Sequence, residues 1–186
     1  MRRVTTTILS TKQTSTGTNI LVNSDFTADY ANNSGTFGDT WVQDNFVHPG
    51  SPRWNWDSIN ENTFTDSVGA QRMMYGINDN SSTTGSQTLK FEVVSSTGGS
   101  VFRVYVWGID GTGWTITHWN ITAQPSGGTL VDTLLDTGLI DAVRTNEILE
   151  YTIDCGTGYD YLVFCFGVDA NIGETLILDN IEFLVS

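Results

Sequence analysis

The sequence contains few of the side chains on which most catalytic sites are built. It has only two histidines, His48 and His118, and neither lies in a recognisable nucleophile or metal motif. It also lacks a Gly-x-Ser-x-Gly, a His-Glu-x-x-His and a phosphate-binding loop. Asp57 and Glu61 could act as a carboxylate pair, but 21 acidic residues make chance pairs common. We therefore predict that the protein is not an enzyme.

Cysteines and long apolar runs are equally scarce. Cys155 and Cys165 have no spacing that argues for a metal site, and unpaired thiols suit a reducing cytosol. Met1-Arg2-Arg3 resembles the start of a signal peptide, but the apolar core that such a signal needs does not follow. We expect no export signal and no transmembrane span, and synthesis inside a cell.

Lysine occurs only twice, and the basic residues are distributed unevenly along the chain. Residues 1–18 contain Arg2, Arg3 and Lys12 without any acid, which gives a charge of +3. Residues 19–186 contain 5 basic and 21 acidic residues, which gives −16 and a total of −13. A body this acidic repels nucleic acid and anionic membranes, so we predict neither as a partner. The acids could also serve solubility alone.

The charge boundary coincides with a change of composition. Residues 1–18 are rich in Thr and Ser and close with Gly17, so we predict an extended N-terminal arm. Its run from Val4 to Leu9 could add to the edge of a sheet. Residues 19–186 are predicted to form one domain, which at this length buries roughly 70% of its unfolded surface.

Most of the domain alternates apolar and polar residues with turn signals between the runs. No helical pattern is longer than the ambiguous 139–149, and a single helical turn at 141–144 would not change the class. These features predict an all-β, antiparallel β-sandwich. The predicted strands cover residues 19–26, 41–46, 54–56, 71–77, 88–93, 101–107, 114–122, 130–135, 147–153, 159–168 and 175–185.

The last of these strands, TLILDNIEFLV, has an acid in its middle. Its alternation stops at Asp179-Asn180 and then resumes, which predicts a one-residue bulge. A carboxylate beside a core is costly unless it is hydrogen-bonded or holds a cation. Asp179 therefore needs a partner.

The run from residue 101 to 107 has two informative faces. Phe102, Val104 and Val106 are predicted to face a core. Arg103 and its outward neighbours at 105 and 107 lie together on the opposite face.

Four segments carry a family resemblance: NILVNSDF, QTLKFEV, VFRVYVW and LILDNIEF. They resemble the carbohydrate-binding modules of the 4/9/22 group, which are β-jelly rolls. The resemblance spans residues 19–185. The opening Asn-x-x-x-Asn-x-x-Phe and the closing Asp-Asn-Ile stand at the expected ends, and the middle matches mainly in strand pattern. The resemblance implies a jelly roll in which the first and last strands meet.

The same resemblance implies one cofactor, a structural calcium. In that family an acid just after the opening Phe often holds the ion together with the Asp of the closing motif. Thr27 stands where the usual Glu would be, and the loss of that carboxylate should weaken a site for a hard cation. Asp179 is retained, and Asn23 or Asp25 could contribute. The alternative is that Asp179 is a hydrogen-bonded cap of the bulge.

The resemblance further implies carbohydrate-binding aromatics on a concave sheet, where flat rings stack on sugars and planar polar groups bind hydroxyls. Arg103, Tyr105 and Trp107 fit this pattern, and Trp54 and Trp56 could join them. Large aromatics also fill cores, so burial of any of these tryptophans is an equal expectation.

Two functions follow. We favour a structural virion protein, most simply a bacteriophage capsid or tail decoration made in the host cytoplasm, because of the missing signal, the thiols and the basic arm. Arg2, Arg3 and Lys12 would contact other virion proteins or copies of the chain, and the body could also bind surface glycans. The alternative is an extracellular carbohydrate-binding module that anchors a glycoside hydrolase to polysaccharide.

Overall fold

The structure is a computed structural model, which describes ten segments of the chain: residues 17–21, 41–43, 54–56, 62–65, 71–78, 83–96, 101–119, 122–141, 144–169 and 175–185. All regular structure within these segments is β-strand. In the same segments, no helix has the length and apolar character needed to cross a membrane.

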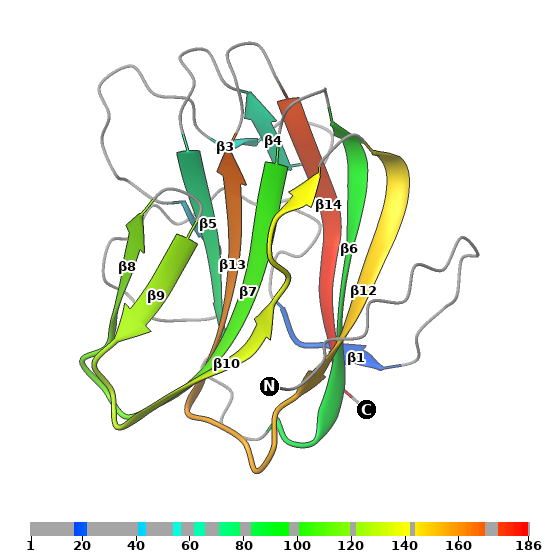
Figure 1. The fold of residues 1–186 in the computed structure, drawn as a ribbon. Helices are drawn as coiled ribbons and strands as arrows, with labels where there is room; N and C mark the ends of the chain where they lie inside the picture. The colour runs from blue at the N-terminus through cyan, green and yellow to red at the C-terminus, as the bar shows by residue number, and fades with distance from the viewer. Residues whose placement is uncertain are drawn as a thin grey trace.

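Twelve of the fourteen described strands form two antiparallel sheets that face each other as layers, and the other two form a separate hairpin (Figure 1). The β6 sheet has the order β12 (Thr145–Asp154), β6 (Ser86–Ser96), β14 (Thr175–Val185), β4 (Asn62–Thr65) and β3 (Trp54–Trp56), with β1 (Thr18–Asn19) paired to β14. The β7 sheet has the order β10 (Leu130–Asp136), β7 (Val101–Asp110), β13 (Tyr161–Asp169), β5 (Gln71–Asn78) and β2 (Trp41–Gln43), with β11 (Ile140–Asp141) paired to β7. The predicted antiparallel sandwich of jelly-roll type is confirmed.

The main core fills the space between the two sheets. On β6 the alternation places Leu89, Phe91 and Val93 inside, and all three side chains are fully buried. Aromatic rings join the layers: the centroid of Phe91 lies 5.1 Å from that of Phe166 on the β7 sheet, with the rings edge to face. Burying rings of this size supplies most of the apolar surface that stabilises a sandwich.

The first and last strands meet, as predicted. Thr18 pairs with Val185, and Asn19 pairs with Leu184. The side-chain oxygen Oδ1 of Asn19 accepts hydrogen bonds from the backbone N–H groups of Leu21, at 3.1 Å, and Phe183, at 3.0 Å. The opening asparagine therefore fastens the start of the domain to its last strand, and pairing begins at Thr18, within the segment assigned to the arm.

The predicted interruption of β14 is confirmed. The pairing register with β6 shifts between Asp179 and Glu182, and Asn180 has a φ of 49°. A positive φ at a bulge is readily adopted by asparagine.

The prediction of one strand over 114–122 is wrong. The chain instead forms a hairpin of β8 (Thr115–Trp119) and β9 (Thr122–Ser126), in which Trp119 pairs with Thr122. Strand-forming residues continue on both sides of the reversal, so alternation did not mark it. The short strand β4 was not predicted. Cys155 and Cys165 are buried, and no disulfide joins them.

Gly108 on β7 makes room for an aromatic side chain. The ring of Tyr159 packs so closely over Gly108 that an added Cβ would overlap it. The Tyr159 hydroxyl donates a 2.8 Å hydrogen bond to Oδ2 of Asp132, which pairs with Gly108 across β10 and β7. Burial, and then this hydrogen bond, raise the pKa of Tyr159 from its ordinary value of 10 to about 12. A glycine, a tyrosine and an aspartate thus close this end of the core.

Gly108→Ala is expected to lower the free energy of unfolding by about 1–3 kcal/mol, because the new methyl group displaces the Tyr159 ring. Urea denaturation measures the loss. The matched control is the same substitution in a Tyr159→Ala background, where the ring is gone and the added cost should largely disappear. An equal cost in both backgrounds would contradict the packing.

Candidate functional site

The outer face of β7 was the predicted carbohydrate-binding surface. The predicted division of its side chains is confirmed: Phe102, Val104 and Val106 belong to the core between the sheets. Tyr105 and Trp107 belong to a separate apolar cluster on the opposite side of the β7 sheet. In the sheet, Tyr105 pairs with Cys165 of β13 and Trp107 pairs with Val163, so the cluster continues onto the next strand.

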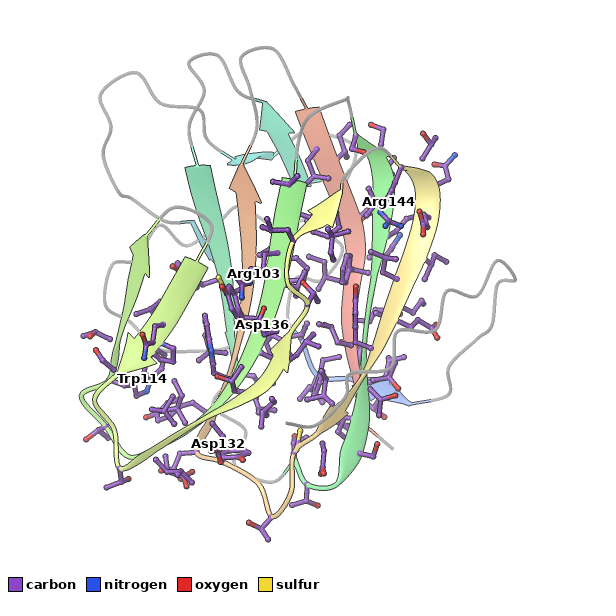
Figure 2. The ribbon with its side chains drawn as sticks, viewed as in Figure 1. Arg103, Trp114, Asp132, Asp136 and Arg144 are labelled. Atoms are coloured by element: carbon purple, nitrogen blue, oxygen red, sulfur yellow. The ribbon has the colours of Figure 1, made fainter. Side chains whose placement is uncertain are left out.

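This second cluster is a closed core, which we call the hairpin core. Its buried members are Tyr75, Tyr105, Trp107, Ile109, Trp114, Val163 and Cys165. Ile116 of β8 and Ala123 of β9 pack against it, so the hairpin lies over this part of the sheet. In Figure 2, Trp114 lies beside the hairpin of β8 and β9.

The hairpin core leaves little of its aromatic surface accessible. The exposed fraction is 4% for Tyr105, 1% for Trp107 and 2% for Trp114. A sugar ring stacks on the flat face of an accessible aromatic side chain. These rings are packed against protein instead, which stabilises the hairpin on the sheet.

Arg103, Tyr105 and Trp107 form a continuous stack along β7. The Tyr105 and Trp107 rings are nearly parallel, at 17°, with centroids 4.9 Å apart. The Cζ atom of Arg103 lies 4.8 Å from the centroid of the Tyr105 ring on the same strand. Burial raises the pKa of the Tyr105 hydroxyl, and the nearby Arg103 charge opposes that rise. The guanidinium contributes a cation–π contact to the end of the hairpin core.

Asp136 on β10 binds Arg103 with two hydrogen bonds (Figure 2). Nε of Arg103 donates to Oδ1 at 2.7 Å, and Nη2 donates to Oδ2 at 2.5 Å. The backbone N–H of Gly138 also donates to Oδ1. These donors, with Arg103 first, lower the pKa of Asp136, and the bond to Asp136 raises the pKa of Arg103. The predicted sugar-binding guanidinium is therefore committed to a partner within the chain.

Trp54 and Trp56 lie on β3, at the edge of the β6 sheet. The predicted set of five carbohydrate-binding residues is thus divided between the two sheets. The assignment of carbohydrate binding to Arg103, Tyr105, Trp107, Trp54 and Trp56 stays a prediction.

Asp179 has hydrogen-bond donors at the bulge. Its Oδ1 accepts from the backbone N–H of Asn180 at 2.7 Å, and its Oδ2 accepts from the Asn180 side chain at 3.0 Å. The same Asn180 amide donates to Glu92 at 3.2 Å. This is the bulge cap considered from sequence.

A calcium site at Asp179 stays a prediction. Asn23 and Asp25 lie outside the described residues, as do Arg2, Arg3 and Lys12 of the arm. Among the described residues, no three or more His, Cys, Asp or Glu side chains are grouped so that they could hold a metal ion.

Sequence reasoning missed the residues that close the predicted site. Ile116 and Ala123 cover it from the hairpin, and Asp136 neutralises Arg103. The one usable signal was Trp114-Thr-Ile-Thr-His-Trp followed by Thr-Ala-Gln-Pro, two short polar-apolar runs that can form a hairpin.

Comparison with solved structures shows the fold alone. A structure described as "CBM4 structure and function" aligns with a TM-score of 0.59 and 8% identity, over 89% of this chain and 99% of that one. The enzymatically active domain of bacteriophage CBA120 tailspike protein 4 aligns with a TM-score of 0.51 and 14% identity, over 90% of this chain. This chain spans 21% of the tailspike chain. No family model and no curated protein matches the sequence.

The Arg103 and Asp136 pair predicts how stability changes in acid. Because the pKa of Asp136 is lowered in the folded state, its stabilisation is present above the ordinary carboxyl pKa and is lost as pH falls through the folded pKa. At neutral pH, Asp136→Asn should cost about 0.5–1 kcal/mol, a small value because the carboxylate is partly exposed. Below pH 4, chemical denaturation should show that the Asp136→Asn variant loses less stability to acid than the wild type does.

Arg103→Leu is the control for this experiment. It removes the same pair from the other side, so it should reduce the acid dependence to a similar extent. The double variant should resemble either single one. Wild-type acid dependence in both single variants would show that the pair contributes nothing.

Proposed function

We propose that the protein is a structural protein of a bacteriophage particle, made in the host cytoplasm and incorporated into the capsid or tail. The observation that carries the proposal is the closed hairpin core, in which Tyr105 and Trp107 are 4% and 1% exposed. A carbohydrate platform needs accessible rings. A face filled by the protein's own hairpin favours a rigid scaffold that packs beside other proteins.

Two further observations support this role. The fold is shared with a domain of a bacteriophage tailspike protein over 90% of this chain. Residues 1–18 carry +3 and the remainder −16, so an arm from one copy and the body of another attract each other. The partners are other virion proteins or copies of this chain.

The proposed role requires no catalysis. Three carboxylates on the strands of the two sheets have structural partners: Asp132 binds Tyr159, Asp136 binds Arg103, and Glu182 binds Lys90. A general acid or base must instead be free to exchange a proton with a substrate.

The proposal is tested on particles produced by the genome that encodes the chain. Density-gradient purified virions should contain the protein in many copies, seen by quantitative mass spectrometry, and antibodies against residues 19–186 should label intact particles in electron microscopy. A host cytosolic protein quantified in the same fractions controls for contamination. Absence of the chain from purified particles would overturn the proposal.

Carbohydrate binding is the second candidate function. The observation in its favour is the fold match to the CBM4 structure over 89% of this chain and 99% of that one. The Arg103 and Asp136 pair offers the planar polar group, since their side chains are 22% and 36% exposed beside the edge of the hairpin core. A hydroxyl pair of a polysaccharide or a surface glycan could bind there.

A glycan array tests this second function. If it holds, the wild type binds at least one glycan, and Arg103→Ala weakens that binding about tenfold, equivalent to about 1.4 kcal/mol. Arg144→Ala is the matched control, because that arginine forms its ion pair with Glu147 beside the other sheet. Failure of the wild type to bind any glycan would exclude the function, and equal losses in the two variants would exclude the Arg103 site.

A further inference from the structure

β12 forms an unusually open edge of the sandwich. It is ten residues long and is the outermost strand of the β6 sheet (Figure 1). In the part of the chain that the structure describes, β12 pairs with β6 alone. The backbone groups on its far side can therefore accept an added strand.

From Glu147 onward β12 has none of the prolines, lysines or bulges that commonly block strand addition, whereas Asn146 near its start has a φ of 50°. Its sequence, TNEILEYTID, contains no proline and no lysine. Its register with β6 runs without a shift from Glu147 to Asp154. The edge strand β10 of the other sheet differs, because it has seven residues and a register shift between Thr133 and Leu135. Of these two edges, β12 is the better template for an added strand.

The outer face beside this edge is acidic. One row across three strands is Glu150 of β12, Lys90 of β6 and Glu182 of β14, and Lys90 binds Glu182 at 2.6 Å. The next row places Glu92 beside Asp179. These two rows hold four carboxylates against one ammonium, a net charge of −3. Two copies of β12 would repel each other, whereas a basic strand would be attracted.

We propose that the N-terminal segment of a second copy of this chain adds to the outer edge of β12. The run Val4 to Leu9 is VTTTIL, rich in the β-branched residues that strands favour, and carries no acid. Arg2, Arg3 and Lys12 flank it and give residues 1–18 the +3 charge that matches the −3 face. Six residues in a strand span about 20 Å, which fits within the length of β12. The inference rests on the proposed structural role, for which it supplies the contact between copies.

A basic segment between two copies also offsets the repulsion between their acidic bodies. Residues 19–186 carry −16, so two bodies approach each other unfavourably unless a basic segment lies between them. The arm of one chain on the edge of the next is a head-to-tail contact that repeats along a series of copies. Binding of the segment to the edge of its own chain would leave the protein monomeric.

A charge-exchange experiment with the whole chain tests the inference. The arm variant carries Arg2→Glu, Arg3→Glu and Lys12→Glu, and the face variant carries Glu92→Lys and Glu150→Lys. Sedimentation velocity at low salt should show self-association of the wild type, with each variant alone weakened about tenfold or more. A mixture of the two variants should associate again, because the acidic arm of one then matches the basic face of the other.

The control variant carries four added lysines at exposed positions outside the β6 sheet and its turns: Thr112→Lys, Thr115→Lys, Gln124→Lys and Thr133→Lys. It changes the net charge by +4, as the face variant does, and should associate like the wild type. The arm variant leaves the body unaltered, so the test holds even if the face variant is unstable. A monomeric wild type, or an arm variant that associates normally, overturns the inference.

Hydrogen exchange distinguishes strand addition from simple charge attraction. Residues 145–154 should gain backbone protection on association of the wild type, and they should not gain it in the arm variant. Association without that protection overturns the added strand. If purified particles contain the protein but isolated chains fail these tests, the contact is wrong and the structural role stands. If the chains associate through β12 but are absent from particles, the structural role is wrong.

Discussion

Trp107 lies on the outer side of the β7 sheet, yet only 1% of it is exposed, because the β8 and β9 hairpin packs across it. The proposed use of the sandwich depends on this contact. Two large rings, Tyr105 and Trp107, stack with centroids 4.9 Å apart and anchor the hairpin. Removing rings of this size from a core costs about 3–5 kcal/mol, more than a surface ion pair contributes. The face is therefore held closed by packing. The ion pair of Arg103 with Asp136 lies at the edge of this face, beside the Tyr105 ring.

Closing one face changes where the molecule can interact. The core between the sheets and the hairpin core bury the apolar side chains of β7 on both sides. The outer face of the β6 sheet is polar and acidic around Lys90, and its edge strand β12 is regular. Assembly through backbone hydrogen bonds at that edge, directed by charge, needs no exposed apolar surface. The closed hairpin face is therefore compatible with the proposed role as a structural protein of a particle.

The sequence was sufficient for features that depend on local alternation. The two faces of β7 and the interruption at Asp179 follow from residues within one strand, whereas the meeting of the first and last strands was implied by the family resemblance. The burial of Trp107 could not be predicted in this way. It depends on a hairpin that lies over another strand, and a strand with two apolar faces has the same pattern whether the second face binds a ligand or a neighbouring hairpin.

Partners across strands were equally hidden. Asp136 is 33 residues from Arg103, and among 21 acids nothing in the sequence selects it. The separation of Trp54 from Trp107 onto different sheets follows from strand order, which side-chain patterns do not encode. The hydrogen bonds of Asp179 to Asn180 could be anticipated as one alternative because they are local.

Hydroxyl-radical footprinting of the native protein, read by mass spectrometry, tests the closed face most directly. Trp107 and Tyr105 should be protected to the level of fully buried side chains such as Phe91. Both should become reactive only when the chain is unfolded in denaturant. Rapid oxidation of Trp107 in the native protein would show an open aromatic surface and would contradict the closed hairpin core.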